Sequence, residues 1–117
     1  MMPFSDSRES FFGQWMMIPV FDYKIFKTGG DVLVAIADSS VVGKSFEEGD
    51  LKIEVSSSFY SDSKCDEKEA LGIIKKATIV NAVGKDIVSL LLKEGLVESG
   101  KVITIKKVPH AQIVVLK

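Results

Sequence analysis

His110 is the side chain best suited to acid–base chemistry, because it is the only histidine and imidazole titrates near neutral pH. A general acid or base must also be positioned by a partner group, and the sequence next to Val108-Pro109-His110 supplies no evident one. We therefore favour hydrogen bonding at a strand connection over catalysis. A small enzyme that uses His110 as general acid or base is the alternative.

Gly43-Lys44-Ser45 has the residue types that end a phosphate-binding loop. In such loops a further glycine lies five residues upstream and a helix follows, so that backbone N–H groups surround the phosphates. Asp38 occupies the upstream position, and Gly49-Asp50 would interrupt a following helix. We therefore expect neither a nucleotide site nor a cofactor.

Cys65 is the single cysteine of the chain, so no internal disulfide and no multi-cysteine zinc site can form. A thiol just before a helix can have a depressed pKa and act as a nucleophile, but we favour a surface or half-buried thiol without a chemical role. We expect no metal site. A chain with one cysteine suits a reducing compartment, and the cytoplasm is the expected location.

The remaining candidates are residues that a hydrophobic core does not require: loop glycines, a lysine, and side chains with directional hydrogen bonds. We predict that the Gly43–Gly49 loop and the Val108–Gln112 connection form one binding surface. Its candidate residues are Gly43, Lys44, Phe46, Gly49, His110 and Gln112, with Asn81, Lys106 and Lys107 as further members.

The positions of His110 and its neighbours distinguish binding from catalysis. A binding module would place His110 on one face with Lys44 and the Lys106-Lys107 pair. An enzyme would bury His110 in a cleft beside Glu54, Asp50 or Asn81. Because the chain has one histidine and no evident nucleophile–base pair, we rank a non-catalytic binding module first.

Composition bounds these functions. The chain has 117 residues, of which 46% are hydrophobic and 26% charged, and its net charge is -1. No apolar run approaches the roughly 20 residues that a membrane-spanning helix needs. Residues 1–63 contain five basic and ten acidic residues, whereas the remainder contains ten basic and six acidic residues. A basic face can therefore form, although the total charge gives no support to nucleic-acid binding.

Strands are predicted at both ends of the chain. Alternating residues from Phe21 to Ala37 surround Gly29-Gly30, which is typical of a hairpin. The segment 38–50 is too broken for a regular element, and a third strand follows at 51–55. Two β-branched runs at 102–107 and 111–116 predict a second hairpin, joined through Val108-Pro109-His110.

Helices are predicted between these strands. Asp66 and Glu69 form a capping box, and apolar residues then recur at helical spacing. We expect a bend near 81–84, with Asn81 capping a second helix, and an end at Gly95 in a left-handed conformation. The order β-β-β-α-α-β-β predicts an α+β fold, with an antiparallel or mixed sheet and a helical pair packed on one face.

The chain is expected to consist of one domain and an N-terminal extension. Residues 20–117 are expected to form one domain. Residues 1–19 are interpreted as an N-terminal extension or an over-extended gene start, with Met16 or Met17 as the true initiator.

Several separated motifs occur along the chain: Tyr23-Lys24-x-x-Lys27-Thr28-Gly29-Gly30, Gly43-Lys44-x-Phe46-x-x-Gly49-Asp50-Leu51, Phe59-Tyr60, Ala77-Thr78-Ile79-x-Asn81-x-Val83-Gly84 and Val108-Pro109-His110-Ala111-Gln112. Together they resemble the archaeal domain of unknown function 424 family, from about Val20 to Leu116. The resemblance implies an archaeal cytoplasmic protein and no established activity. RNA or a protein of the translation machinery is the partner class that we attach to it, with no membrane association; a homodimer stays open.

Overall fold

The computed structural model describes residues 19–114. The predicted extension therefore lies outside the described residues, apart from Pro19. The described elements, in chain order, are β1 (Phe21–Thr28), β2 (Asp31–Asp38), η1 (Ser39–Val41), β3 (Ser45–Glu48), β4 (Leu51–Glu54), α2 (Ser57–Tyr60), β5 (Ser63–Cys65), α3 (Glu67–Lys75), β6 (Ile79–Val83), α4 (Lys85–Lys93), η2 (Ser99–Lys101), β7 (Ile103–Ile105) and β8 (Val108–Val114).

The main sheet has six strands in the order β5-β1-β2-β6-β8-β7. Its first three strands come from residues 21–65 and its last three from residues 79–114. Each half is antiparallel, and the parallel pair β2–β6 joins them, with Leu33 opposite Ile79 and Ala37 opposite Val83. The sheet is thus mixed, as predicted.

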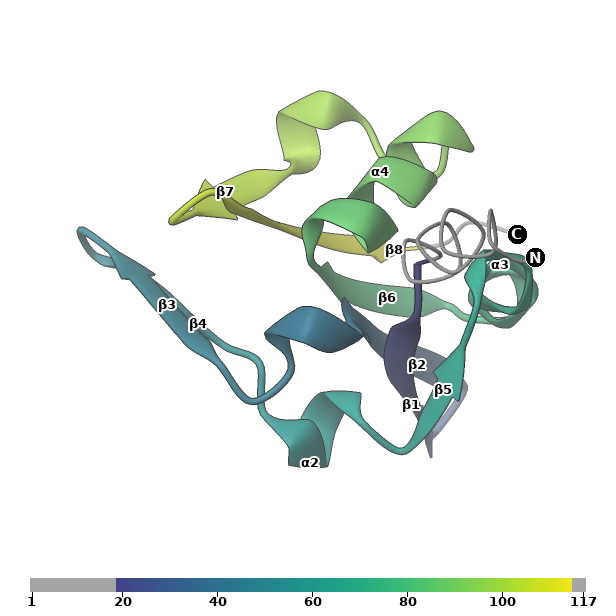
Figure 1. Ribbon diagram of the computed structural model, residues 1–117. Helices are drawn as coiled ribbons and strands as arrows, with labels where there is room; N and C mark the ends of the chain where they lie inside the picture. Colours follow the sequence, from purple (N-terminus) through teal and green to yellow (C-terminus); the bar gives the residue numbers. More distant parts are fainter. Residues whose placement is uncertain (1–18, 115–117) are drawn as a thin grey trace, which may run out of the picture.

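Both faces of this sheet carry a core. On one face α3 and α4 pack over a large cluster that includes Val34, Val80 and Leu91. On the other face α2 and the segment from Val41 to Val55 cover a smaller cluster around Ala35 and Val83. Figure 1 shows α4 and α2 on opposite sides of the strands. The predicted α+β class with a helical pair on one face is confirmed.

The helix ends follow the sequence signals. Asp66 and Glu69 form the predicted capping box at the start of α3. At the end of α4, Gly95 has a φ of +72°, and the Leu96 N–H donates to the Leu91 carbonyl at 2.8 Å. This arrangement is a Schellman motif, in which the last carbonyl groups of the helix accept hydrogen bonds that they would otherwise lack.

One predicted helical segment is a strand instead. Residues 79–83 form β6, so the predicted bend between two helices and the capping role of Asn81 are wrong. The run is buried on both faces of the sheet, with Val80 in the larger core and Val83 in the smaller one. A strand that is covered on both faces does not alternate strictly between apolar and polar residues. Over a short length, its apolar pattern also fits a helix.

Two loop predictions are also wrong. Residues 45–48 form β3, which pairs with β4 in a separate two-stranded sheet. In the C-terminal hairpin the connection is Lys106-Lys107, and Pro109 and His110 lie within β8. The hairpin itself is confirmed.

Candidate functional site

The hairpin of residues 45–54, which we call the arm, projects away from the main sheet (Figure 1). Two backbone hydrogen bonds close its base: Gly43 N–H donates to Val55 O at 2.6 Å, and Val55 N–H donates to Lys44 O at 2.9 Å. Gly43 has a φ of +88°, which favours glycine at this position. Lys44 is exposed, and Phe46 packs with the smaller core.

The tip of the arm contacts the turn between β7 and β8. The Lys106 N–H donates to the Glu48 carboxylate at 2.8 Å, next to Gly49, which has a φ of +61°. Lys106 and Lys107 have φ values of +52° and +67° and form a two-residue turn. A residue with a side chain costs about 1 kcal/mol in this conformation. The turn is thus strained and is fixed to the arm.

His110, Gln112 and Asn81 lie on one uncovered part of the sheet. Asn81 is directly opposite Gln112, and His110 lies between Val83 and Ile103 on the neighbouring strands. Because alternate residues of a strand share a face, all of these residues lie on the side of the smaller core. We call Asn81, Ile103, His110 and Gln112 the open face.

The open face adjoins the base of the arm. Val108, two residues before His110 on the same side of β8, packs with the smaller core, as Phe46 does. The structure therefore brings the two predicted segments together. Gly49 is the exception, since it lies at the arm tip.

The His110 environment gives little support to proton transfer. The side chain is half-buried, and burial lowers its pKa, so it is neutral at pH 7. Within residues 19–114 no carboxylate is hydrogen-bonded to its ring. Asn81 lies diagonally across the strands, whereas Glu54 and Asp50 belong to the arm.

A buried aspartate organises the carboxyl ends of the parallel strands. The Asp38 carboxylate accepts hydrogen bonds from the N–H groups of Asp86 and Ile87, both at 2.9 Å, and so caps α4 from β2. Burial raises the pKa of Asp38, the two N–H donors lower it by less, and the Asp86 charge raises it further. A Cβ at Gly84 would lie 2.4 Å from Asp38 Cγ, so only glycine fits at this position.

A small cleft of about 280 Å³ lies beside this cap. Ligands of open α/β sheets bind at the carboxyl ends of parallel strands, and Ser40, Lys85 and Lys107 line the cleft here. The helix N-terminus, however, is already occupied by Asp38. The arrangement caps a helix, and the cleft has no further described feature that indicates a ligand.

Residues 26–116 match the family described as "Protein of unknown function (DUF424)". The chain belongs to the DUF424 family. It is also similar to a solved structure, titled "Crystal structure of an uncharacterized conserved protein from Methanopyrus kandleri", with a TM-score of 0.71 and 24% identity over 83% of this chain and 92% of that chain. This likeness shows the fold. The curated proteins give no match.

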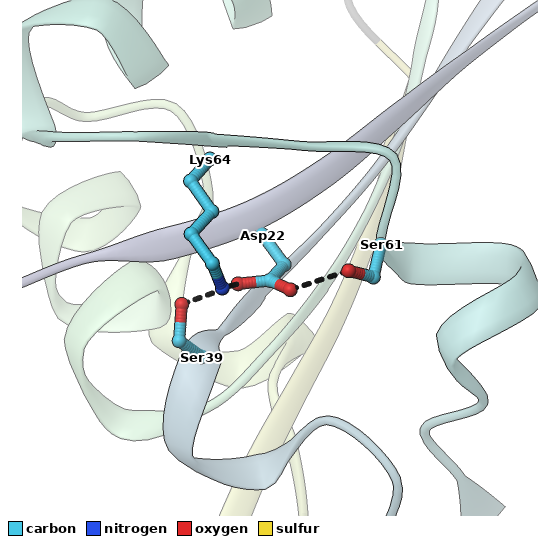
Figure 2. A network of polar contacts seen from close by, with 4 residues as sticks. All are labelled: Asp22, Ser39, Ser61 and Lys64. Carbon is cyan, nitrogen blue, oxygen red and sulfur yellow. Dashed lines mark hydrogen bonds and ion pairs between the residues drawn. The ribbon is translucent and has the colours of Figure 1, made fainter.

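A second buried aspartate ties three segments of the DUF424 chain together (Figure 2). Asp22 in β1 accepts hydrogen bonds from Ser39, from Ser61 at 2.5 Å and from Lys64 Nζ at 2.8 Å. Burial raises the pKa of Asp22, but these three donors outweigh it, so that the pKa is lowered overall. The network joins β1, η1, the end of α2 and β5, which is a structural role.

Cys65 is buried and free. Burial, followed by the charges of Glu69, Asp66 and Asp22, raises its pKa to about 11. The expected surface or half-buried position of this thiol is therefore wrong, and the raised pKa disfavours the thiolate that acts as a nucleophile. In the part of the DUF424 chain that the structure describes, no group of three or more histidine, cysteine, aspartate or glutamate side chains is placed to hold a metal ion, and no helix could cross a membrane.

Sequence reasoning missed the two aspartates. Asp38 was noted only as the residue that breaks a phosphate-loop pattern, and Gly43-Lys44-Ser45 in fact leads into β3, not into a helix. The position of Asp38 at the end of a buried strand could have suggested that it caps a helix distant in sequence. Nothing in the sequence around Asp22 indicates its partners, which come from 17 to 42 residues away.

Proposed function

We propose that this DUF424 chain is a non-catalytic binding module, and that its partner is a protein that docks on the arm and the open face. The observation that carries the proposal is the arm itself, a two-stranded hairpin that leaves the main sheet and keeps Leu51 48% exposed near its tip. Binding residues concentrate on connecting segments that a rigid scaffold positions, and the arm is such a segment.

The arm is held in shape before any partner arrives. An isolated hairpin is marginally stable in water, but this one is fixed at its base by the Gly43–Val55 pair and at its tip by Glu48 and Lys106. Phe46 and Ile53 anchor its inner side to the smaller core. A preorganised element loses little conformational entropy on binding, which favours affinity.

The arm is acidic, whereas Lys44, Lys106 and Lys107 at its base and tip are basic, so the surface as a whole has no basic excess. Glu47, Asp50 and Glu54 are exposed, with Lys52 as the one basic residue of β3 and β4. Carboxylates repel the phosphates that dominate nucleic-acid binding. We therefore place RNA second. An association with the translation machinery, a cytoplasmic location and an archaeal source belong to the same proposal as implications of the family resemblance.

The open face completes the surface. Asn81 and Gln112 offer amide donors and acceptors side by side, and Ile103 is 50% exposed. Interfaces combine an apolar patch with such directional polar groups. Gly43, Lys44, Phe46, Gly49 and the Lys106-Lys107 turn frame this surface in the proposal.

The test is site-specific cross-linking followed by measured binding. A photoreactive amino acid at Leu51 should cross-link one protein in a cell extract, which is then identified, purified and titrated. Leu51→Asp should weaken that binding at least tenfold, because an apolar contact is lost and a buried charge costs free energy. Leu92→Asp is the matched control, since Leu92 is exposed on α4.

Three outcomes would contradict the proposal. One is a nuclease-sensitive RNA complex, and another is equal cross-linking from Leu92. The third is binding of the purified partner that Leu51→Asp and Leu92→Asp reduce by the same factor.

A further inference from the structure

A groove of about 580 Å³ lies on the other face of the sheet, between the β1–β2 hairpin and α3. Its volume is about twice that of the cleft beside Asp38. Strand residues form an apolar floor, and charged residues lie at its rim. The lining consists of Tyr23, Ile25, Lys27, Val32, Val34, Glu69, Gly72, Ile73 and Lys76.

The described residues leave this groove uncovered. Ile25 is 42% exposed, since β5 pairs with β1 only from Phe21 to Tyr23. Gly72 lies within α3, and a Cβ added there would meet no atom within 4 Å. Glycine is a poor helix former, and here it keeps open the space between the helix and the strands. An apolar groove of this size indicates an occupant.

We propose that the groove is occupied by residues 11–17 of this same chain. Five of these seven residues are large and apolar: Phe11, Phe12, Trp15, Met16 and Met17. They lie outside the described part of the chain, as does nearly all of the segment interpreted above as an extension. Their composition matches the floor formed by Ile25, Val32 and Val34, because aromatic and methionine side chains fill irregular apolar spaces.

The segment is within reach of the groove. Val20 is held beside η1, where its carbonyl accepts a hydrogen bond from the Ser39 N–H at 3.1 Å, and the groove begins at Tyr23. Extended chain spans about 3.3 Å per residue, so seven residues cover roughly 23 Å. The floor from Tyr23 to Lys27 is about 14 Å long. The segment is therefore long enough to cover the floor.

Covalent connection and charge favour this occupant over a separate molecule. A short tether gives an effective concentration on the order of millimolar. The rim carries Lys27, Lys76 and Glu69, a net charge of +1. The residues ahead of Phe11 include Asp6, Arg8 and Glu9, a net charge of -1. The opposite net charges of the groove rim and of the side chains ahead of Phe11 attract each other.

Trp15 provides the test, because it is the only tryptophan of the chain. In the full chain its fluorescence should be blue-shifted relative to the urea-unfolded protein and weakly quenched by acrylamide. Ile25→Glu should move the emission toward that of the unfolded chain and raise the quenching constant several-fold. Ile103→Glu is the matched control, because Ile103 is also an exposed isoleucine of a strand but lies on the opposite face of the sheet. It should leave the emission and the quenching constant unchanged.

A second variant guards against misfolding. Gly72→Arg adds a long side chain at an exposed helical position where a Cβ meets no atom, so folding should be retained. It should release Trp15 as Ile25→Glu does, with unchanged far-ultraviolet circular dichroism. The proposal is overturned if native Trp15 already emits like the unfolded chain or if neither groove variant changes its emission. A blue shift that disappears on dilution would identify a second copy as the occupant instead.

Discussion

Asp22 and Asp38 are two buried aspartates at the same end of the β1–β2 hairpin, on opposite faces of the sheet, with opposite pKa shifts. Asp22 is held by a lysine and two serine hydroxyls, which stabilise its charge. Asp38 is held by backbone N–H groups alone and is desolvated beneath α4. The comparison teaches that a carboxyl group with a shifted pKa can be structural, and that its donors decide the sign of the shift.

The largest expected effect is on the Asp38 side. Gly84→Ala would place a methyl group against the Asp38 carboxylate, at a φ of +126° that alanine rarely adopts. Overpacking and backbone strain together should lower the free energy of unfolding by on the order of 3 kcal/mol. Urea denaturation measures this change. Gly100→Ala is the control, since a Cβ there meets no atom within 4 Å, and an equal loss in both variants would contradict the cap.

The two aspartates should respond to acid in opposite directions. Because the folded pKa of Asp22 is lowered, its contribution is present above the unfolded value of about 3.9 and is lost as the pH falls through the folded pKa. The folded pKa of Asp38 is raised, so its contribution is present below about 3.9 and is lost as the pH rises through the folded pKa.

Neutral variants measure this difference. The native chain should be more stable than Asp22→Asn at pH 6, and this difference should shrink as the pH falls to 3. The range extends about one to two pH units to either side of the unfolded aspartate pKa. As the pH falls over the same range, the stability of the native chain relative to Asp38→Asn should rise. Urea titrations at each pH give both differences, and parallel curves would show that the two carboxyls are in equivalent environments.

The smallest effect is expected at the charged partner of Asp22. The Lys64 side chain is 66% exposed, so solvent screens its ion pair. Lys64→Met should lower the free energy of unfolding by less than about 1 kcal/mol, because Ser39 and Ser61 still donate to Asp22. A loss as large as that of Gly84→Ala would mean that the lysine, rather than the hydroxyls, holds the network.

The sequence predicted those parts of the fold whose signals are local. The Asp66–Glu69 cap, the Gly29-Gly30 hairpin and the Gly95 helix end each depend on residues within one turn of the chain. The strand β6 was missed because its burial comes from strands distant in sequence. The Lys106-Lys107 turn was missed because lysine does not signal a positive φ, and this error moved His110 from a connection into a strand.

The candidate site was predictable only in part. Glycines and polar residues outside the core indicated the Gly43–Gly49 and Val108–Gln112 segments, which the structure brings together around Phe46 and Val108. That residues 45–54 form a projecting hairpin could not be predicted, because Phe46 is the one apolar and partly buried residue of Ser45–Glu48, which therefore has no apolar alternation. Its pairing with Leu51–Glu54 depends on the base and tip contacts described above.

The parallel pair β2–β6 has a consequence for how the chain folds. The hairpins β1–β2 and β7–β8 need only short-range closure, since each is joined by a two-residue turn. The β2–β6 pair joins Leu33 to Ile79 and Ala37 to Val83, partners 46 positions apart in the chain, which carries a loop-closure entropy. Pairing of this kind is slow, so we expect the two hairpins to form first and the long-range pairs β1–β5 and β2–β6 to limit the folding rate.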